Sequence, residues 1–331
     1  MKAIVCEKYG PPDVLQLKAV AKPAPKDDEV LIKVHAASVN MYDWHLLTAD
    51  IFLVRLSGEG LLKPKSTIPG ADVAGRVEAV GKNVKQFRPG DEVYGDVGHG
   101  SFADYVCAPE NRLALKPSNL SFEQAAAVPM AALTALQGLR DQGKIQPGQR
   151  VLIQGASGGV GTFAVQIAKS FGAQVTAVCS TRNLEQARAL GADQVIDYTK
   201  EDFTKSGQRY DLIFAANGYH PISAYKRALT PKGVYVMAGG TAAQIFQAML
   251  LGSWMSEREG KKMGGVVGRS NQKDLIFLKG LIEAGKVRPV IDRCYSLGET
   301  ADALRYLGTG HARGKIVITI EHSNKTKVAK E

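Results

Sequence analysis

A glycine-rich stretch near the middle of the chain has the residue types and spacing to hold a phosphate group. Residues 151–161 read as a buried strand, a tight turn and a helix start. Such a turn exposes backbone N–H groups, and the helix N-terminus adds partial positive charge, so together they bind a pyrophosphate. The spacing departs from the strict GxGxxG pattern, and a glycine-rich turn without a ligand is the alternative. The residues expected to form the site are Gly155, Ala156, Ser157, Gly158, Gly159, Val160 and Gly161.

The end of the following strand predicts which dinucleotide the turn accepts. NAD sites usually place Asp or Glu there, about 20 residues further on, to bind the ribose 2′-hydroxyl. Here the strand ends in Ser180-Thr181-Arg182, and the first acid is Glu185. Hydroxyl groups beside an arginine suit a 2′-phosphate, because hydrogen bonds from guanidinium to phosphate are strong. The sequence therefore favours NADP(H), with Tyr198 closing over the same phosphate; a solvated helix-start charge is the alternative for Arg182.

The elements that position these residues alternate between strand and helix. We expect strands over 150–154, 174–179, 194–197, 211–215 and 233–238, and helices over 159–171, 183–190 and 222–229. This alternation predicts βαβ units and a doubly wound parallel sheet, so that the turn lies in a strand–turn–helix unit followed by further units.

The flanking regions predict a second, β-rich domain. Residues 1–123 contain short β-branched runs separated by Gly, Pro and Asp, followed by a helix over 124–139 with Ser121 as its N-cap. Beyond Gly265 come helices over 272–284 and 299–307, a strand over 294–296 and a last strand over 315–320 that could return to the first domain. We expect an α/β chain divided at 1–123, 124–266 and 267–331, with a flexible basic tail from about 322.

Composition excludes several classes of protein. The 331 residues carry a formal charge of +10, but the basic residues are scattered among acids, which favours a solvated surface over a nucleic-acid partner. The four cysteines show no paired spacing, and the apolar run at 242–255 is too short and too polar to span a membrane. With no signal or transit pattern before the first strand, the expected location is cytoplasmic.

Taken together, the motifs resemble those of the zinc-free quinone oxidoreductase (zeta-crystallin-like) branch of the medium-chain dehydrogenase/reductase superfamily. The resemblance runs from residue 1 to about 320 and implies a GroES-like catalytic domain around a Rossmann domain, an interdomain active site, and a homodimer or homotetramer. Besides the glycine turn, it rests on Asn40-xx-Asp43, Pro69-Gly-Ala-Asp72-Val-Ala-Gly75, Gly90-Asp-Glu-Val-Tyr-Gly95, Ala131-Ala-Leu-Thr134-Ala and His311-Ala-Arg-Gly-Lys315.

The expected chemistry follows from ligands that are missing. Zinc-dependent members that resemble this chain carry cysteine where Asn40 stands and Gly-His-Glu where this chain has Gly70-Ala71-Asp72, so a tetrahedral zinc site cannot be built from these positions. Simple alcohols need a Lewis acid for oxidation, whereas hydride addition to a quinone or an enone needs only hydrogen-bond donors for the developing oxyanion. We expect a metal-free, NADPH-dependent reductase of quinones or α,β-unsaturated carbonyls. A metal-free alcohol or aldehyde oxidoreductase and a non-catalytic NADPH-binding protein are the alternatives.

The resemblance also implies residue roles. The amide of Asn40 would donate to the substrate oxygen, and His45 and, more weakly, Tyr42 are candidate proton or hydrogen-bond donors. A surface histidine beside Trp44 is the alternative for His45. Thr134 would approach the nicotinamide or its ribose. Asp43 is expected to brace its loop. An apolar segment at 245–263 favours a small hydrophobic, electrophilic substrate. Asn217, Gly239 and Gly240 follow predicted strands, at the carboxyl ends where an open sheet binds ligands, and are expected to contact the cofactor. The resemblance adds Val266, Val267, Arg313 and Lys315 as cofactor positions; a plain structural role is the alternative for Arg313 and Lys315.

Overall fold

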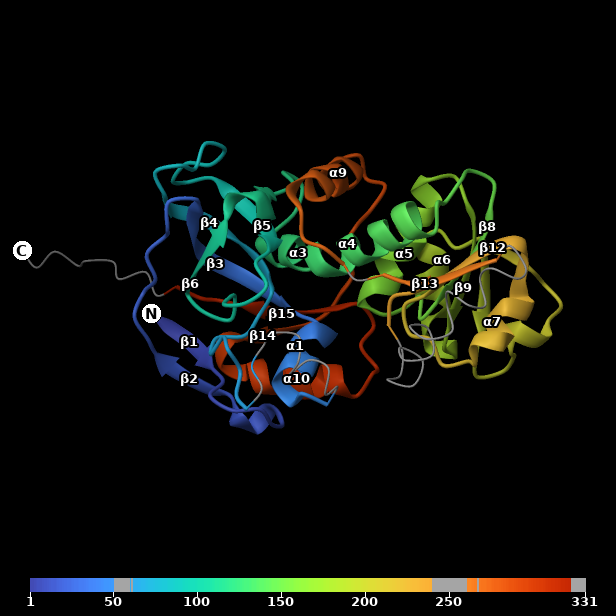
Figure 1. Cartoon of the computed structure of the whole chain (residues 1–331), viewed down its shortest axis with the longest axis horizontal. Helices are drawn as coiled ribbons and strands as arrows, with labels where there is room; N and C mark the ends of the chain where they lie inside the picture. The colour runs from blue at the N-terminus through green and yellow to red at the C-terminus, as the bar shows by residue number, and fades with distance from the viewer. Residues whose placement is uncertain (51–59, 61, 240–260, 267, 323–331) are drawn as a thin grey trace, which may run out of the picture.

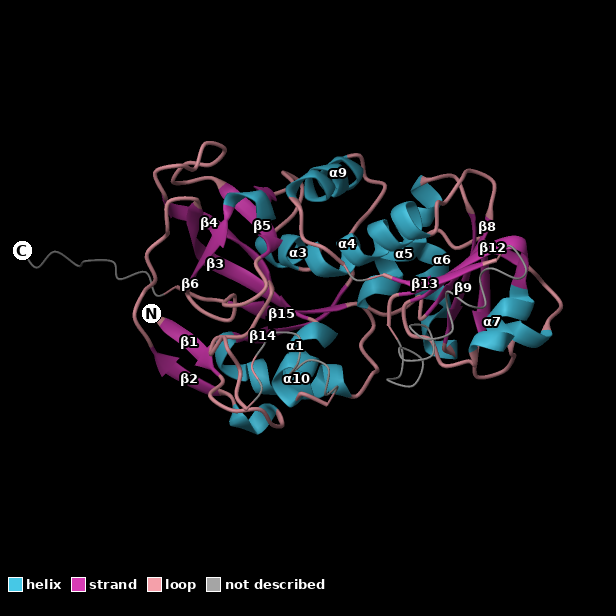
Figure 2. Ribbon diagram, in the orientation of Figure 1, coloured by secondary structure: helices cyan, strands magenta, loops and turns pink. Residues whose placement is uncertain are grey.

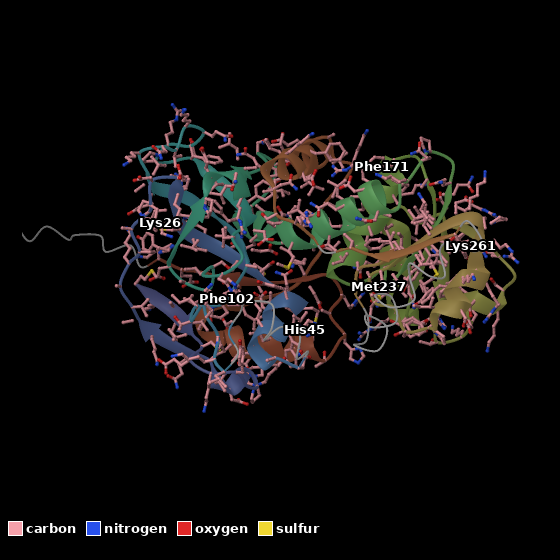
Figure 3. All side chains as sticks on the ribbon, viewed as in Figure 1. Lys26, His45, Phe102, Phe171, Met237 and Lys261 are labelled. Carbon is pink, nitrogen blue, oxygen red and sulfur yellow. The ribbon has the colours of Figure 1, made fainter. Side chains whose placement is uncertain are left out.

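The computed structural model describes residues 1–50, 60, 62–239, 261–266 and 268–322. In Figure 1 the described chain forms two lobes, each built on its own sheet, with α4 (Pro129–Gln137) running between them. His45 and Phe102 belong to the first lobe and Met237 and Phe171 to the second (Figure 3). Gly240, Val267 and the segment 245–260 lie outside the described residues, as does 323–331 of the expected tail.

The first lobe contains a seven-stranded sheet with the order β14-β15-β3-β4-β5-β7, in which β6 also pairs with β3. The expected return of the last strand is confirmed: β15 pairs antiparallel with β3, placing Ile316 opposite Val39 (Figure 1). A separate two-stranded sheet joins β1 (Lys2–Val5) and β2 (Gln16–Ala19). The bounds are β3 (Glu29–Val39), β4 (Asp72–Val80), β5 (Glu92–Asp96), β6 (Tyr105–Pro109), β7 (Leu113–Leu115), β14 (Ile291–Ser296) and β15 (Lys315–Thr319).

The second lobe is the expected parallel sheet, with the strand order β10-β9-β8-β11-β12-β13. Its strands lie among helices α5, α6 and α7 (Figure 2). The order reverses between β8 and β11, and in open α/β sheets ligands bind at the carboxyl ends of the strands at such a switch point. The bounds are β8 (Arg150–Gln154), β9 (Gln174–Cys179), β10 (Gln194–Asp197), β11 (Tyr210–Ala215), β12 (Leu229–Met237), β13 (Lys262–Gly265), α5 (Gly159–Ser170), α6 (Leu184–Ala189) and α7 (Ile222–Ala228).

The helix expected over 124–139 is instead two helices, because of Pro129. The first, α3 (Phe122–Ala126), begins at Ser121, whose hydroxyl accepts from the Gln124 amide as expected of an N-cap. Pro129 lacks an N–H and cannot continue that helix, but it suits the first position of α4. The sequence analysis also missed β13, and it placed the start of β12 four residues too late.

The remaining helices pack against the first lobe and its border with the second. Helix α9 (Gln272–Glu283) packs against α4 and β7, and the buried Tyr94 hydroxyl donates to Leu275 O at 2.7 Å. Helix α1 (Met41–Thr48) packs against α10 (Thr300–Gly308), where a Cβ on Gly308 would meet the Trp44 ring at 2.5 Å. Among the described helices, none combines the length and the apolarity that a membrane crossing requires.

Candidate active site

The glycine turn between β8 and α5 has the geometry of a phosphate cradle. Gly155 has φ +74°, a conformation that favours glycine. A Cβ on Gly161 would come within 2.0 Å of Gly155 O, so only glycine lets α5 approach the turn this closely. A Cβ on Gly158 would meet only Gly155 O, at 3.6 Å, among the described atoms. The outer side of the turn is therefore open, and the first amides of α5 lack intrahelical acceptors, so these residues fit a diphosphate.

Asn217 and Gly239 line the same edge of the sheet. A Cβ on Gly155 would lie 3.2 Å from Asn217, just beyond β11. Gly239 follows β12, and its carbonyl accepts from the Gly218 amide at 3.0 Å. A Cβ on Gly239 would stand 2.6 Å from Ala216 O, so a side chain is not tolerated at this close approach. The structure thus brings these two predicted positions next to the glycine turn.

Arg182 lies where the second lobe meets the segment that leads into β15. Its Nη2 donates to His311 O at 3.0 Å, and Arg313 Nη2 donates back to Arg182 O at 3.3 Å. Both arginines are exposed, and each guanidinium group donates to a backbone carbonyl of the segment that carries the other. This pair can attract a phosphate group from solvent.

The neighbouring hydroxyl groups are less available than the sequence suggested. Thr181 Oγ1 donates to Asp197 Oδ2 at 2.5 Å, so this hydroxyl is already committed to a buried carboxylate. Ser180 Oγ accepts from Asn183 Nδ2 at 3.1 Å. Tyr198 is half-exposed and its ring centroid lies 5.9 Å from that of Tyr219, on the solvent side of the same edge.

Asn183 is a residue that the sequence analysis missed. It is 4% exposed, and its Nδ2 also donates to Ser157 Oγ at 3.0 Å. It therefore ties the glycine turn to the end of β9. An asparagine just before a helix reads as an ordinary N-cap, so its sequence context gives no sign of this contact.

The polar cluster of the first lobe is centred on Asp72, the first residue of β4, which is fully buried. Asp72 Oδ2 accepts from Ser38 Oγ at 2.7 Å and from Asn40 Nδ2 at 3.0 Å. Asp72 Oδ1 accepts from the Met130 amide at 2.9 Å, which anchors the first turn of α4. The sequence motif contains Asp72, but only the fold shows that its carboxylate organises the cluster.

Lys315 reaches this cluster from β15. Its Nζ donates to Asn40 Oδ1 and lies 3.4 Å from both Asp72 Oδ2 and Val39 O. Lys315 is 3% exposed, so its charge is compensated inside the protein by Asp72. The two N–H bonds of Asn40 point to Asp72 Oδ2 and, at 3.4 Å, to Ser38 O. A substrate oxygen could receive a hydrogen bond from Asn40 only by replacing one of these acceptors.

Two further carboxyl groups near the cluster have raised pKa values. Asp43 Oδ2 accepts from the Asn40 amide at 2.8 Å, which is the bracing contact expected of it. Burial raises the pKa of Asp43 to about 7, and the charge of Asp72 adds to the effect. Burial and the same charge raise the pKa of Asp96 to about 6. The cluster therefore contains groups that exchange protons near neutral pH.

The other predicted catalytic residues lie on helices that the cluster anchors. Tyr42 and His45 follow Asn40 on successive turns of α1, three residues apart and hence on one face. His45 Nδ1 lies 2.8 Å from Asp50 Oδ1, and the Tyr42 ring is 6.1 Å from that of His99. The half-buried Thr134 lies one turn beyond Met130 on α4.

Thr134 also meets the segment that follows β13. A Cβ on Gly268 would stand 2.6 Å from Thr134 Oγ1. Val266, two residues earlier, donates its amide to Met237 O at 2.9 Å. The segment that follows β13 and helix α4 therefore come together here.

A groove elsewhere on the second lobe does not belong to this site. A surface groove of about 340 Å³ lies at the opposite, amino-terminal ends of β8 to β11, between Arg150 and Arg209, and contains none of the predicted site residues. Within the described part of the chain, no three His, Cys, Asp or Glu side chains are grouped so that they could hold a metal ion.

Two family models match the chain. The alcohol dehydrogenase GroES-like domain matches residues 26–118, and a model described as zinc-binding dehydrogenase matches residues 190–318. The words zinc-binding dehydrogenase describe the family as a whole. In this chain, Asn40 and Ala71 stand at the positions where zinc-dependent members have cysteine and histidine.

Named relatives and solved structures agree with these matches. The chain is 39% identical to a 2-methylene-furan-3-one reductase of Solanum lycopersicum, over 96% of this chain and 79% of the relative. It is 38% identical, over the same shares, to a chloroplastic NADPH-dependent alkenal/one oxidoreductase of Arabidopsis thaliana. The structure of the quinone oxidoreductase from Coxiella burnetii superposes with a TM-score of 0.85 at 33% identity, covering 97% of this chain and 99% of the other. The chain therefore belongs to the medium-chain dehydrogenase/reductase superfamily, in its zinc-free quinone and alkenal oxidoreductase branch.

Proposed function

We propose that this protein uses NADPH to reduce quinones or α,β-unsaturated carbonyl compounds. The observation that carries the proposal is the meeting of two sites: the stem of Lys315, whose ammonium lies in the Asp72 cluster, passes 3.1 Å from where a Cβ on Gly159 would be. The glycine turn and the buried polar cluster thus both contact the side chain of Lys315. The tomato and Arabidopsis relatives, named as reductases of a furanone and of alkenals and alkenones, support the same substrate class.

The residues of the second lobe would hold the cofactor. The amides at the start of α5 would bind the diphosphate. Arg182 would bind the 2′-phosphate together with Arg313, since Arg182 follows β9 and the Arg313 guanidinium donates to Arg182 O. Asn217, Gly239 and Val266 would line the path along the carboxyl ends of the strands. When bound, NADPH supplies the hydride that the electrophilic carbon of the substrate accepts.

The residues of the first lobe would orient the substrate and deliver a proton. Asn40 would donate to the substrate oxygen by exchanging its 3.4 Å contact with Ser38 O, the longest hydrogen bond it makes. His45 and Tyr42, both half-buried on one face of α1, are the proposed proton donors, and Thr134 would support the cofactor from α4. None of these steps uses a metal ion, in keeping with Asn40 and Ala71 at the positions where zinc-dependent members have cysteine and histidine.

We also propose that the protein is cytoplasmic, since its sequence shows no signal or transit pattern, and that it forms a homodimer or homotetramer, as the resemblance to this branch implies. The name of the Arabidopsis relative places that protein in the chloroplast, so the compartment of this chain is to be measured directly. Fractionation with an antibody to the chain and light scattering of the purified protein test the two points.

The function is tested by following NADPH oxidation optically with 1,4-benzoquinone, 9,10-phenanthrenequinone, a short enone, an enal and a simple aldehyde. A parallel assay follows NADP⁺ reduction with simple alcohols. Turnover of quinones or enones, with alcohols inert and chelators without effect, is the expected result. Turnover of alcohols alone would replace the proposal by a metal-free alcohol oxidoreductase. Tight NADPH binding without turnover of any compound would replace it by a non-catalytic binding protein.

A further inference from the structure

The side chain of Lys315 joins the two halves of the candidate site. The pairing of β15 with β3 places Ile316 opposite Val39, which brings Lys315 beside Asn40. The ammonium donates to Asn40 Oδ1 and lies 3.4 Å from Asp72 Oδ2. Nearer the backbone, Lys315 Cδ lies 3.1 Å from where a Cβ on Gly159 would be. One side chain therefore contacts the polar cluster with its charged end and the first turn of α5 with its stem.

Building on the reductase function given above, we propose that Lys315 is a positioning residue that fixes the orientation of the Asn40 amide and couples the environment of this amide to occupation of the glycine turn. An asparagine amide presents an oxygen acceptor on one side and an NH₂ donor on the other. Here the oxygen faces an ammonium and the NH₂ faces the Asp72 carboxylate. The reverse orientation would set donor against donor and acceptor against acceptor, so the two charged groups select one state.

The dependence on the turn follows from charge and from contact. The N-terminus of α5 carries partial positive charge, which repels the ammonium that lies near it. An anionic group on the turn reverses the sign of that field and attracts the ammonium away from Asn40 Oδ1. Because Gly159 has no side chain, nothing stands between the stem of Lys315 and the backbone of this turn. Binding at the turn is therefore expected to change the environment of the Asn40 amide.

The test uses the full-length protein with ¹⁵N-labelled asparagine, and it records the side-chain amide signals during titration with NADP⁺. The Asn40 signal is assigned as the one that Asn40→Ser removes. Lys315→Met alone leaves Asp72 buried without its cation, which can prevent folding. The variant to measure is therefore Lys315→Met/Asp72→Asn, which keeps the shape of both side chains and removes both charges.

The matched control is Lys116→Met/Glu92→Gln. Lys116 is also a nearly buried lysine, 3.3 Å from a carboxylate of the same lobe, but Glu92 pairs with Arg76 at the opposite end of the β4–β5 ladder from Asp72. It therefore controls for the loss of a partly buried lysine–carboxylate pair that does not contact the glycine turn, although the Glu92 side chain is 37% exposed. The control is expected to behave as the wild type in every measurement below.

In the wild type the Asn40 signal should move as NADP⁺ saturates the protein, and in the Lys315→Met/Asp72→Asn variant it should stay in place while NADP⁺ still binds. The variant should lose at least tenfold in kcat, with less than a threefold change in KM for NADPH, and Asp72 restored with Lys315→Arg should regain part of kcat. An Asn40 signal that moves equally in wild type and variant, or an unchanged kcat, overturns the role of Lys315. The titration needs no turnover, so it decides this point even if every substrate of the activity panel fails.

Discussion

Replacing Gly158 with alanine should separate cofactor binding from folding. The backbone there has φ −81° and ψ 177°, an extended conformation that alanine adopts without strain. The new methyl would contact only Gly155 O, at 3.6 Å, among the described atoms, and would otherwise stand in the open side of the turn. Because that side is where we place the diphosphate, the methyl should obstruct the cofactor while leaving the empty protein nearly intact.

The expected magnitudes differ between the two properties. Alanine is a poorer N-cap than glycine, so the free energy of unfolding should fall by about 0.5–1 kcal/mol, a few degrees in Tm at most. Crowding a close-packed contact costs about 1–3 kcal/mol, and 1.4 kcal/mol is tenfold in Kd. The Kd of NADPH should therefore rise roughly tenfold to a hundredfold. NADPH fluorescence titration measures the affinity, and urea unfolding without cofactor measures the stability.

Substitutions at two other glycines serve as controls for Gly158→Ala. A Cβ on Gly161 would stand 2.0 Å from Gly155 O, where ordinary contacts begin at 3.4 Å, so Gly161→Ala must displace backbone by about 1.4 Å and should lose stability as well as binding. Gly280 on α9 has nothing within 4 Å among the described atoms, and Gly280→Ala should gain about 0.5–1 kcal/mol with NADPH affinity unchanged. Wild-type affinity in Gly158→Ala would refute the placement of the diphosphate on the outer side of the turn.

Three further predictions concern the exposed Arg182, the buried carboxyl group of Asp43 and the hydrogen bond from Tyr94 to helix α9. Arg182→Ala should weaken NADPH ten- to a hundredfold in a binding titration and leave NADH unchanged, since only NADPH has the 2′-phosphate; equal losses would exclude the role. Burial raises the pKa of Asp43 from 3.8 to about 7, so the folded state binds its proton more tightly and loses stability as the pH rises from about 4 to 7. Asp43→Asn should reduce this pH-dependent loss of unfolding free energy by up to ~4 kcal/mol, as measured from urea unfolding curves at each pH. Parallel pH profiles of the unfolding free energy for the two proteins would contradict this prediction. Tyr94→Phe removes the side-chain donor to Leu275 O, which keeps its hydrogen bond within α9, and should cost about 0.5–1.5 kcal/mol of unfolding free energy by the same method; an unchanged midpoint would show that this bond adds nothing.

Local signals in the sequence were enough for the first three strands of the second lobe, although not for β12 and β13. The runs of β-branched residues predicted the strands 150–154, 174–179 and 194–197 with the bounds that the structure has. The glycines of the turn are close in sequence, and their conformations depend on neighbours a few residues away. The break at Pro129 was missed because the alanine-rich segment around it has a strong helical pattern, although proline lacks the N–H that a continuous helix needs.

The sequence by itself therefore determined the family, the parallel sheet and the place of the glycine turn before α5, because each depends on short-range pattern and spacing. The cluster of Asn40, Asp72 and Lys315 was decided only by the tertiary structure. Lys315 is 275 residues from Asn40 in the chain, and the two meet because the last strand pairs with β3 in one register. The raised pKa of Asp43 depends in the same way on burial, which no local pattern encodes. A charge held by residues from three distant segments is a property of the folded chain, since the unfolded chain would keep these groups apart and hydrated.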